Sequence, residues 1–137
     1  MADPKHVSLV YSEYSREVAR ELAETFSGQP FNIQFFPDAN AMSQNRLKLE
    51  DVDKPEACKA LVKEHLRRFA KESIPPTLTF VDTTGGKVPM SIGAFQAAEE
   101  IGVSSIYVVG KENGFIKDPG KREHGYPVFI SDHTDSL

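Results

Sequence analysis

The sequence predicts one α/β domain with a mostly parallel, five-stranded sheet between layers of helices. Short apolar, β-branched runs alternate three times with amphipathic helix patterns. Such alternation is typical of βαβ units with right-handed crossovers. The length of 137 residues also suits a single hydrophobic core. We therefore expect one domain over residues 1–137, without internal repeats.

The spacing of hydrophobic residues predicts each secondary-structure element in turn. Alternating or continuous apolar runs predict strands, and apolar positions three and four apart predict helices. The expected elements are a strand at 6–11, a helix at 16–27, a strand at 31–36, a helix at 53–71, a strand at 77–82, a helix at 88–101, and strands at 104–110 and 127–131. The polar residues 39–54 and 111–126 predict connecting segments.

Local signals mark the ends of the expected helices. Ser15 is placed to N-cap the first helix and Gly28 to end it. Asp53 and Glu56 have capping-box spacing, and Gly102 ends the third helix. The positions expected to face the core are Val18, Ala19, Leu22 and Phe26 in the first helix, Cys58, Leu61, Val62, His65 and Phe69 in the second, and Met90, Ala94, Ala97, Ala98 and Ile101 in the third.

Composition limits the classes of function. The formal net charge of −4 argues against a non-specific grip on duplex nucleic acid. A small anion can still bind where helix N-termini and a few cations create a local site. Cys58 is the single cysteine, which excludes an intramolecular disulfide and fits a reducing compartment. His6, His124 and His133 lack metal-ligand spacing, so we expect no metal.

No apolar run approaches the roughly 18 residues that span a bilayer, and no signal peptide is visible. We therefore expect a soluble, cytoplasmic protein. The first strand pattern begins almost at the initiating methionine, which is typical of a domain taken from a longer protein. Any effector or membrane segment would then lie outside these residues, on the N-terminal side.

Two polar loops follow the first and third expected strands. They are Tyr11-Ser12-Glu13-Tyr14-Ser15 and Thr83-Thr84-Gly85-Gly86-Lys87. In open parallel sheets, ligands bind beyond the carboxyl ends of the strands, where the strand order reverses. The two loops meet only if the first and third strands are neighbours. This favours the strand order 2-1-3-4, with the fifth strand, which opens with Pro127, at an edge.

The loop at residues 83–87 has the chemistry of an anion site. Gly85 and Gly86 permit positive φ and a close approach of the backbone to a ligand. Free N–H groups at the start of the next helix favour an anion, and Lys87 adds a full charge. The small side chains at Ser91 and Gly93 are expected to leave room for a ligand beside the helix. A plain strand-to-helix turn explains the same pattern about equally well.

The loop at residues 11–15 can complete such a site. Tyr11 and Tyr14 can stack on bases, and Ser12 and Ser15 can bond to phosphate or ribose. The simpler interpretation makes Tyr11 a core residue and Ser15 only a helix cap.

The stretch TTGGKVPMSIGAFQAAEEIGVSSIYVV (83–109) resembles the second ligand-binding motif of the CRISPR-associated Rossmann-fold (CARF) domains. Their pattern is close to T-G-G-T-K-x-M-S, followed by a small-residue helix and an I-Y-V strand. The matching positions are Thr84, Gly85, Gly86, Met90 and Ser91. The loop at 11–15 lies where that family has its other ligand loop. Lys87 comes one residue earlier than the family's lysine, with Val88 in the usual place.

The resemblance covers most of residues 6–110 and implies a Rossmann-like three-layer fold. It also implies a homodimer that binds a cyclic oligoadenylate, most often cyclic tetra-adenylate, across its two-fold axis. That molecule is the second messenger of type III CRISPR antiviral defence, and its binding switches an attached effector domain. The expected ligand-binding residues are Tyr11, Ser12, Glu13, Tyr14, Ser15, Thr83, Thr84, Gly85, Gly86, Lys87, Met90 and Ser91, with no further cofactor.

Two other functions stay open. A metal-independent ring nuclease would linearise the messenger, and Ser12, Lys87 and His124 are the available helpers, although no catalytic constellation marks them. A generic nucleotide-binding domain would use Asp38 to hold a ribose, although G-x-G-x-x-G is absent after the first strand. We therefore expect a sensor domain without catalytic residues.

Overall fold

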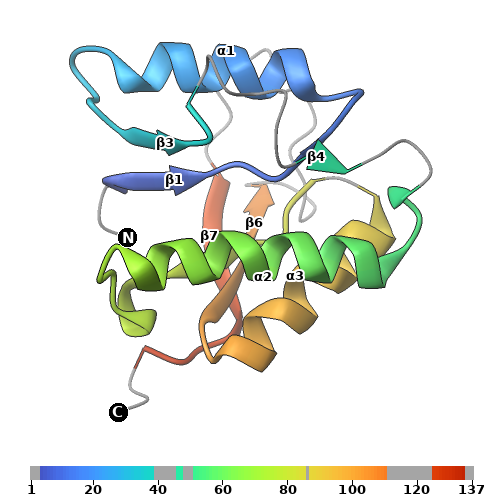
Figure 1. Cartoon of the computed structure of the whole chain (residues 1–137). Helices are drawn as coiled ribbons and strands as arrows, with labels where there is room; N and C mark the ends of the chain where they lie inside the picture. The colour runs from blue at the N-terminus through green and yellow to red at the C-terminus, as the bar shows by residue number, and fades with distance from the viewer. Residues whose placement is uncertain (1–3, 39–45, 48–50, 86, 111–124, 135–137) are drawn as a thin grey trace.

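The computed structural model describes residues 4–38, 46–47, 51–85, 87–110 and 125–134 (Figure 1). These residues form a mixed α/β fold with three α-helices and seven strands. The helices are α1 (Arg16–Ser27), α2 (Pro55–Lys71) and α3 (Val88–Ile101). The strands are β1 (His6–Ser8), β2 (Tyr11–Ser12), β3 (Gln34–Phe36), β4 (Arg46–Leu47), β5 (Phe80–Asp82), β6 (Ser104–Gly110) and β7 (Gly125–Ser131). A short 3-10 helix, Pro76–Leu78, precedes β5.

The described strands pair mostly in parallel. β1 pairs with β3 and β2 with β4, both in parallel, so the first extended segment changes partner between Ser8 and Tyr11. β5 pairs in parallel with β6, and β7 runs antiparallel to β6 as the edge strand of that sheet. The described pairings do not include one between the first strand and β5, so a continuous five-stranded sheet stays a prediction.

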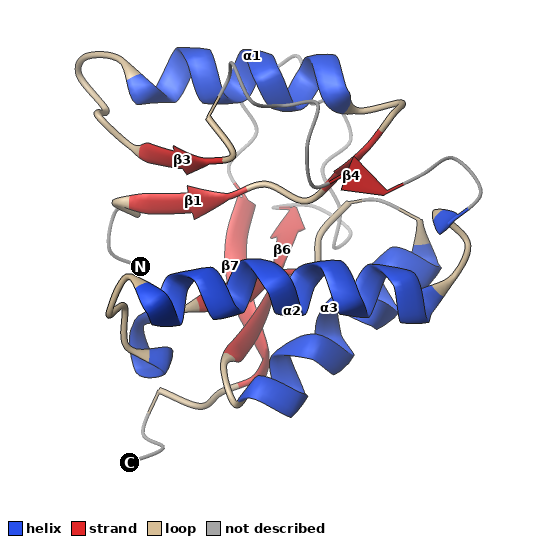
Figure 2. Ribbon diagram, in the orientation of Figure 1, coloured by secondary structure: helices blue, strands red, loops and turns tan. Residues whose placement is uncertain are grey.

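The helices lie on two sides of the strands (Figures 1 and 2). α1 lies along β1 and β3 at the top of the view, and contacts β2 and β3. α2 and α3 pack against each other in front of β6 and β7, and α3 contacts β5 and β6.

Buried side chains form three clusters. The first joins α2 and α3 through Val62, Leu66, Ala94, Ala97, Ala98 and Val103. The second lies under α1 and contains Tyr11, Ala19 and Ala23. The third contains Leu47, Val52, Cys58 and Leu61. Val10 packs against the first and third clusters, so the segment between β1 and β2 links the two.

Gly93 lies where the backbone of α3 comes close to the backbone of α2. A Cβ at this position would lie 2.5 Å from the Pro55 carbonyl oxygen, 2.8 Å from the Cys58 Cβ and 2.8 Å from the Lys59 nitrogen. Only glycine leaves room for that backbone. The prediction that Gly93 lowers a helix surface beside the ligand is therefore wrong, because the residue is buried against α2.

The expected helix bounds at 16–27 and 88–101 are confirmed, as is the Gly102 cap, which takes φ +88°. The predicted core face of α1 is only partly right. Ala19 is buried as expected, whereas Val18 and Leu22 are 58% and 42% exposed, and Ala23, which was not expected to face the core, is buried. The connecting segment expected at 39–54 contains β4, a short strand that the polar pattern concealed.

The capping box expected at Asp53 and Glu56 is wrong. α2 begins at Pro55, its N-cap is Lys54, and no side chain caps it. The carboxylate of Asp53 instead contacts Lys87.

None of the described helices is both long and apolar enough to cross a membrane.

Candidate functional site

The turn from β5 into α3 is held by side-chain hydrogen bonds. The Thr83 N–H and hydroxyl both donate to the Ile106 carbonyl, at 2.9 and 3.0 Å. The Thr84 N–H donates to the Asp82 carboxylate at 2.9 Å, which closes a local Asx turn. These bonds tie the end of β5 to β6, so the following glycine is presented from a fixed position.

Two further hydroxyls hold the same turn. The Val108 N–H donates to the Thr84 hydroxyl oxygen at 2.7 Å. The Ser91 hydroxyl donates to the Thr83 carbonyl at 3.0 Å and lies 3.4 Å from the Gly85 carbonyl. Ser91 and Thr83 therefore act as supports for the turn. Thr84 is exposed, and its hydroxyl proton has no described acceptor, so it can donate to a ligand.

Unused backbone donors gather where α3 begins. Gly85 takes φ +81°, which points the chain into the helix and leaves open space around its Cα. Lys87 is the N-cap and provides no side-chain cap. The N–H groups of Gly85, Lys87 and Val88 donate to no described residue. Together with the positive end of the helix dipole, such donors favour an anion.

The ammonium group of Lys87 pairs with Asp53 at 3.3 Å. Both side chains are exposed, and an exposed pair of this kind contributes at most about 1 kcal/mol. A phosphate can therefore displace Asp53 at little cost. Sequence reasoning missed this partner, because the two residues lie 34 positions apart and carry no local signal of contact.

The loop at 11–15 divides into a buried and an exposed part. Tyr11 is 2% exposed and packs in the cluster under α1, as the simpler interpretation of that residue has it. The Ser12 N–H donates to the Ser15 hydroxyl oxygen at 3.0 Å, so Ser15 closes the loop and its side chain does not cap α1. Glu13 and Tyr14 reach solvent, and Tyr14 is 73% exposed.

The two loops leave the fold at the same edge. Val10 precedes the first loop and packs against two buried clusters. Val81 packs against one of them and Met90 against the other, and Val81 and Met90 flank the second loop. Figure 1 shows the loop after β2 and the turn into α3 on the right of the view. The surface groups there are Glu13, Tyr14, Thr84, Gly85 and Lys87. Gly86, Asn40 to Asn45 and His124 lie outside the described residues.

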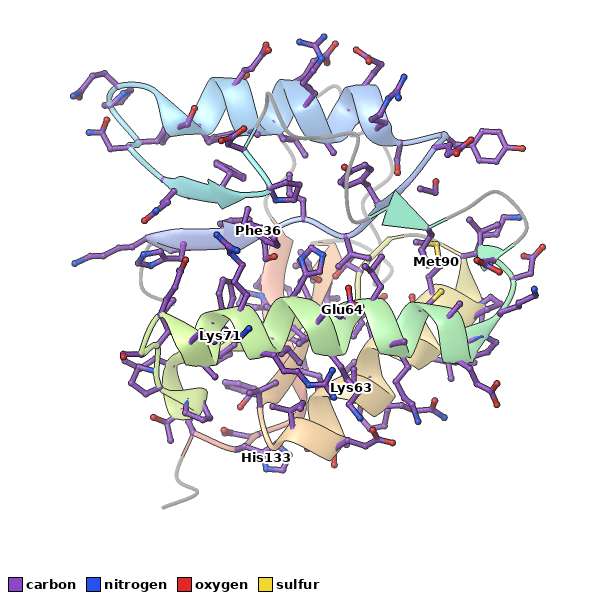
Figure 3. All side chains as sticks on the ribbon, viewed as in Figure 1. Phe36, Lys63, Glu64, Lys71, Met90 and His133 are labelled. Carbon is purple, nitrogen blue, oxygen red and sulfur yellow. The ribbon has the colours of Figure 1, made fainter. Side chains whose placement is uncertain are left out.

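Met90 faces the interior at this edge. It packs against the cluster of Leu47, Val52, Cys58 and Leu61, so its side chain supports α3 and β4 (Figure 3).

Burial raises the pKa of the neighbouring Cys58 thiol, which keeps the thiol neutral. Among the described residues, no group of three or more His, Cys, Asp or Glu side chains is placed to hold a metal ion.

His65 is a buried polar residue, as its place on the expected core face of this helix predicted. It is 4% exposed, and its Nδ1 shares a hydrogen bond with the Ser8 hydroxyl. The Ser8 hydroxyl also lies 3.3 Å from the Phe36 carbonyl. Burial, aided by the charge of Arg68, lowers the pKa of His65 to about 4. The ring is therefore neutral at pH 7, and its Nε2 has no partner among the described residues.

A scan against protein-family models finds no match to this chain, and a search of curated proteins finds none either. The physical basis for a function is therefore the edge itself: a positive-φ glycine, unused N–H donors at the start of α3, and a loosely paired lysine.

Proposed function

We propose that this chain is a sensor domain that binds a cyclic oligoadenylate, with cyclic tetra-adenylate as the first candidate. The observation that carries the proposal is the uncapped start of α3. There, the free N–H groups of Gly85, Lys87 and Val88 coincide with the stretch that resembles the CARF motif. Phosphate oxygens are the natural acceptors for such a group of donors.

The remaining exposed groups at this edge suit the rest of such a ligand. Tyr14 offers an aromatic face on which an adenine can stack. The Thr84 hydroxyl can donate to a phosphate or a ribose oxygen. Lys87 gains a stronger partner when a phosphate replaces Asp53. Each contact uses a group that the fold leaves accessible.

A two-fold dimer resolves the problem of charge. One chain carries a net charge of −4, and a ring of four phosphates adds four negative charges. A homodimer that shares one ring brings two α3 N-termini and two Lys87 side chains to it. The short range of these interactions at physiological salt allows a local positive site on an acidic protein.

The proposal also includes the finer fold, with the first strand beside β5 in the order 2-1-3-4 of a Rossmann-like sheet. Val10 and Val81 pack against the same buried cluster, which supports this neighbourhood. An effector domain that reads the bound state, and a cytoplasmic location where the messenger is made, belong to the same proposal.

We expect calorimetry with cyclic tetra-adenylate to give one ring per two chains, because the site is completed by the second copy. Linear tetra-adenylate at the same concentration is the control, since it carries the same bases without the closed geometry. No heat with the three-, four- or six-membered ring would overturn the proposal. A one-to-one ratio would remove the shared pocket.

We expect Gly85→Val to abolish ring binding. A β-branched side chain is a strong outlier at φ +81°, so the turn must change shape and its N–H groups lose their common direction. Gly102→Val is the matched control, because Gly102 has φ +88° and equally open surroundings at the other end of α3.

Both variants should lose similar stability, about 1–2 kcal/mol, in urea unfolding. Only Gly85→Val should lose affinity in calorimetry. Equal affinity in the two variants would mean that residues 83–87 form a plain turn.

A further inference from the structure

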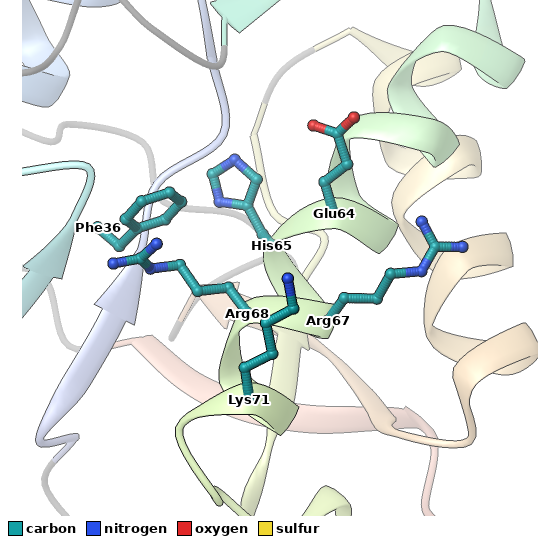
Figure 4. Close-up of a pocket in the computed structure, with 6 residues that line it drawn as sticks. All are labelled: Phe36, Glu64, His65, Arg67, Arg68 and Lys71. Carbon is teal, nitrogen blue, oxygen red and sulfur yellow. The ribbon is translucent and has the colours of Figure 1, made fainter.

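A hollow of about 280 Å³ lies between the C-terminal half of α2 and the end of β3. It is lined by Phe36, Glu64, His65, Arg67, Arg68 and Lys71 (Figure 4). Figure 3 shows Lys71 and Met90 at opposite ends of α2, so the hollow is separate from the edge where α3 begins. Its size falls at the lower end of small-molecule pockets, which suits a compact ligand.

The hollow is positively charged on an acidic protein. Arg67, Arg68 and Lys71 line it with one carboxylate, Glu64, whose side chain points away from Lys71 in Figure 4. Elsewhere on α2, Lys59 and Lys63 both pair with Glu100 at 2.7 Å. Within the described part of the chain, Arg67 and Lys71 have no such ion pair. Figure 4 shows the Arg67 guanidinium pointing away from Arg68, so Arg68 and Lys71 are the two cations whose repulsion an anion in the hollow would reduce.

Contacts with Phe36 and Glu72 restrain the Arg68 side chain before any ligand binds. Its Cζ lies 3.7 Å from the centroid of the Phe36 ring, a cation–π contact that fixes the plane of the guanidinium. Its Nε lies 3.7 Å from the Glu72 carboxylate, which restrains the stem from the next turn. The remaining N–H donors of this planar group match the oxygens of a phosphate. Little side-chain entropy is then lost when an anion binds.

His65 lines the hollow with a neutral ring (Figure 4). The ring packs edge-on against Phe36, with centroids 5.4 Å apart. Because the ring is buried and its Nδ1 is occupied by Ser8, it contributes a floor of low polarity. A low local dielectric strengthens the attraction between the neighbouring cations and an anion.

We propose that this hollow binds the phosphate group of a small phosphate monoester. Arg68 and Lys71 supply the charge and donors, and the stacked Phe36 forms an apolar wall for the ligand's carbon atoms. Glu64 at the rim can accept a hydrogen bond from a hydroxyl of the same ligand. The site goes beyond the proposed sensor function, since it uses the other end of α2.

The test is a nuclear magnetic resonance titration of the full chain with inorganic phosphate and with glycerol 3-phosphate, at constant ionic strength set by NaCl. We expect saturable shifts of the His65 ring and Arg68 side-chain signals, with the organic ligand binding more tightly. His133, which contacts Glu99 and Ser131 far from the hollow, is the internal control and should not shift. No saturable shift at about 20 mM phosphate overturns the proposal.

Variants separate the site from general charge effects. Lys71→Gln removes a cation that reaches the phosphate and should weaken binding at least about tenfold, whereas Arg67→Gln removes one that points away from Arg68 and should weaken binding less. Arg16→Gln removes the same charge from α1 and should leave the affinity unchanged. Equal weakening by all three variants would show non-specific attraction and overturn the proposal. Binding of cyclic tetra-adenylate should persist in Lys71→Gln, so the two sites fail or succeed separately.

Discussion

The Gly93→Ala variant should be destabilised by about 3 kcal/mol in urea unfolding, since overpacking a tight contact costs about that much. The new methyl group would meet the Pro55 oxygen at 2.5 Å and the Lys59 nitrogen at 2.8 Å. Both are backbone atoms of α2, so no side-chain rotation relieves the clash. The helices must separate, which loosens the cluster of Val62, Ala94 and Ala97. The gain of about 1 kcal/mol in helix propensity from alanine offsets only part of this loss.

Gly28→Ala is the matched control for this substitution. A Cβ at Gly28 meets nothing within 4 Å, and its φ of −87° is accessible to any residue. We expect the control to unfold at the same urea concentration as the parent, or slightly above it. A Gly93→Ala protein as stable as the parent would mean that α2 and α3 do not approach this closely.

The stability of the protein should fall as the pH drops below 6.5, because His65 is neutral when folded. Its pKa is lowered from 6.5 to about 4 by burial and by Arg68, so the unfolded chain binds the proton more readily. The stabilisation is fully present above the unfolded pKa and is lost as the pH falls toward the folded one. A shift of this size corresponds to about 3 kcal/mol in total, of which about 2 kcal/mol is lost by pH 5.

The measurement is the free energy of unfolding in urea from pH 7.5 to 5, in buffers free of phosphate. This window isolates His65, because carboxylates with lowered pKa values lose their contribution mainly below about pH 5. His65→Leu should remove most of the slope, whereas His133→Gln should keep it, since His133 is partly exposed beside Glu99. A parent protein with the same slope as His65→Leu would contradict a neutral, buried His65.

Local patterns were sufficient for much of the fold. The 3.6-residue period and the glycine at 102 predicted α3 to the residue, and the apolar run at 104–110 predicted β6. The pair of glycines after β5 predicted a turn with positive φ, which Gly85 adopts. These features succeed because helix periodicity and left-handed backbone geometry depend on residues close in sequence.

Both the local sequence and the tertiary structure were needed to describe the candidate site. The sequence marked the strand-to-helix turn, but it could not say which of its hydroxyls would face a ligand. In the fold, Thr83 and Ser91 are occupied by carbonyls of the turn and of β6, and Met90 is turned inward by the cluster around Leu61. A side chain's partners across the fold decide whether it is available, and no local spacing records them.

The sequence by itself determined the three helices, the turn into α3 and the absence of an intramolecular disulfide. Only the tertiary structure decided the roles of Gly93, Asp53 and His65. Each role arises from a contact with a distant segment: Gly93 with the start of α2, Asp53 with Lys87, and His65 with Ser8 and Phe36. Close approach, charge pairing and burial are set by how whole elements pack, and helical or strand period carries no information about that packing.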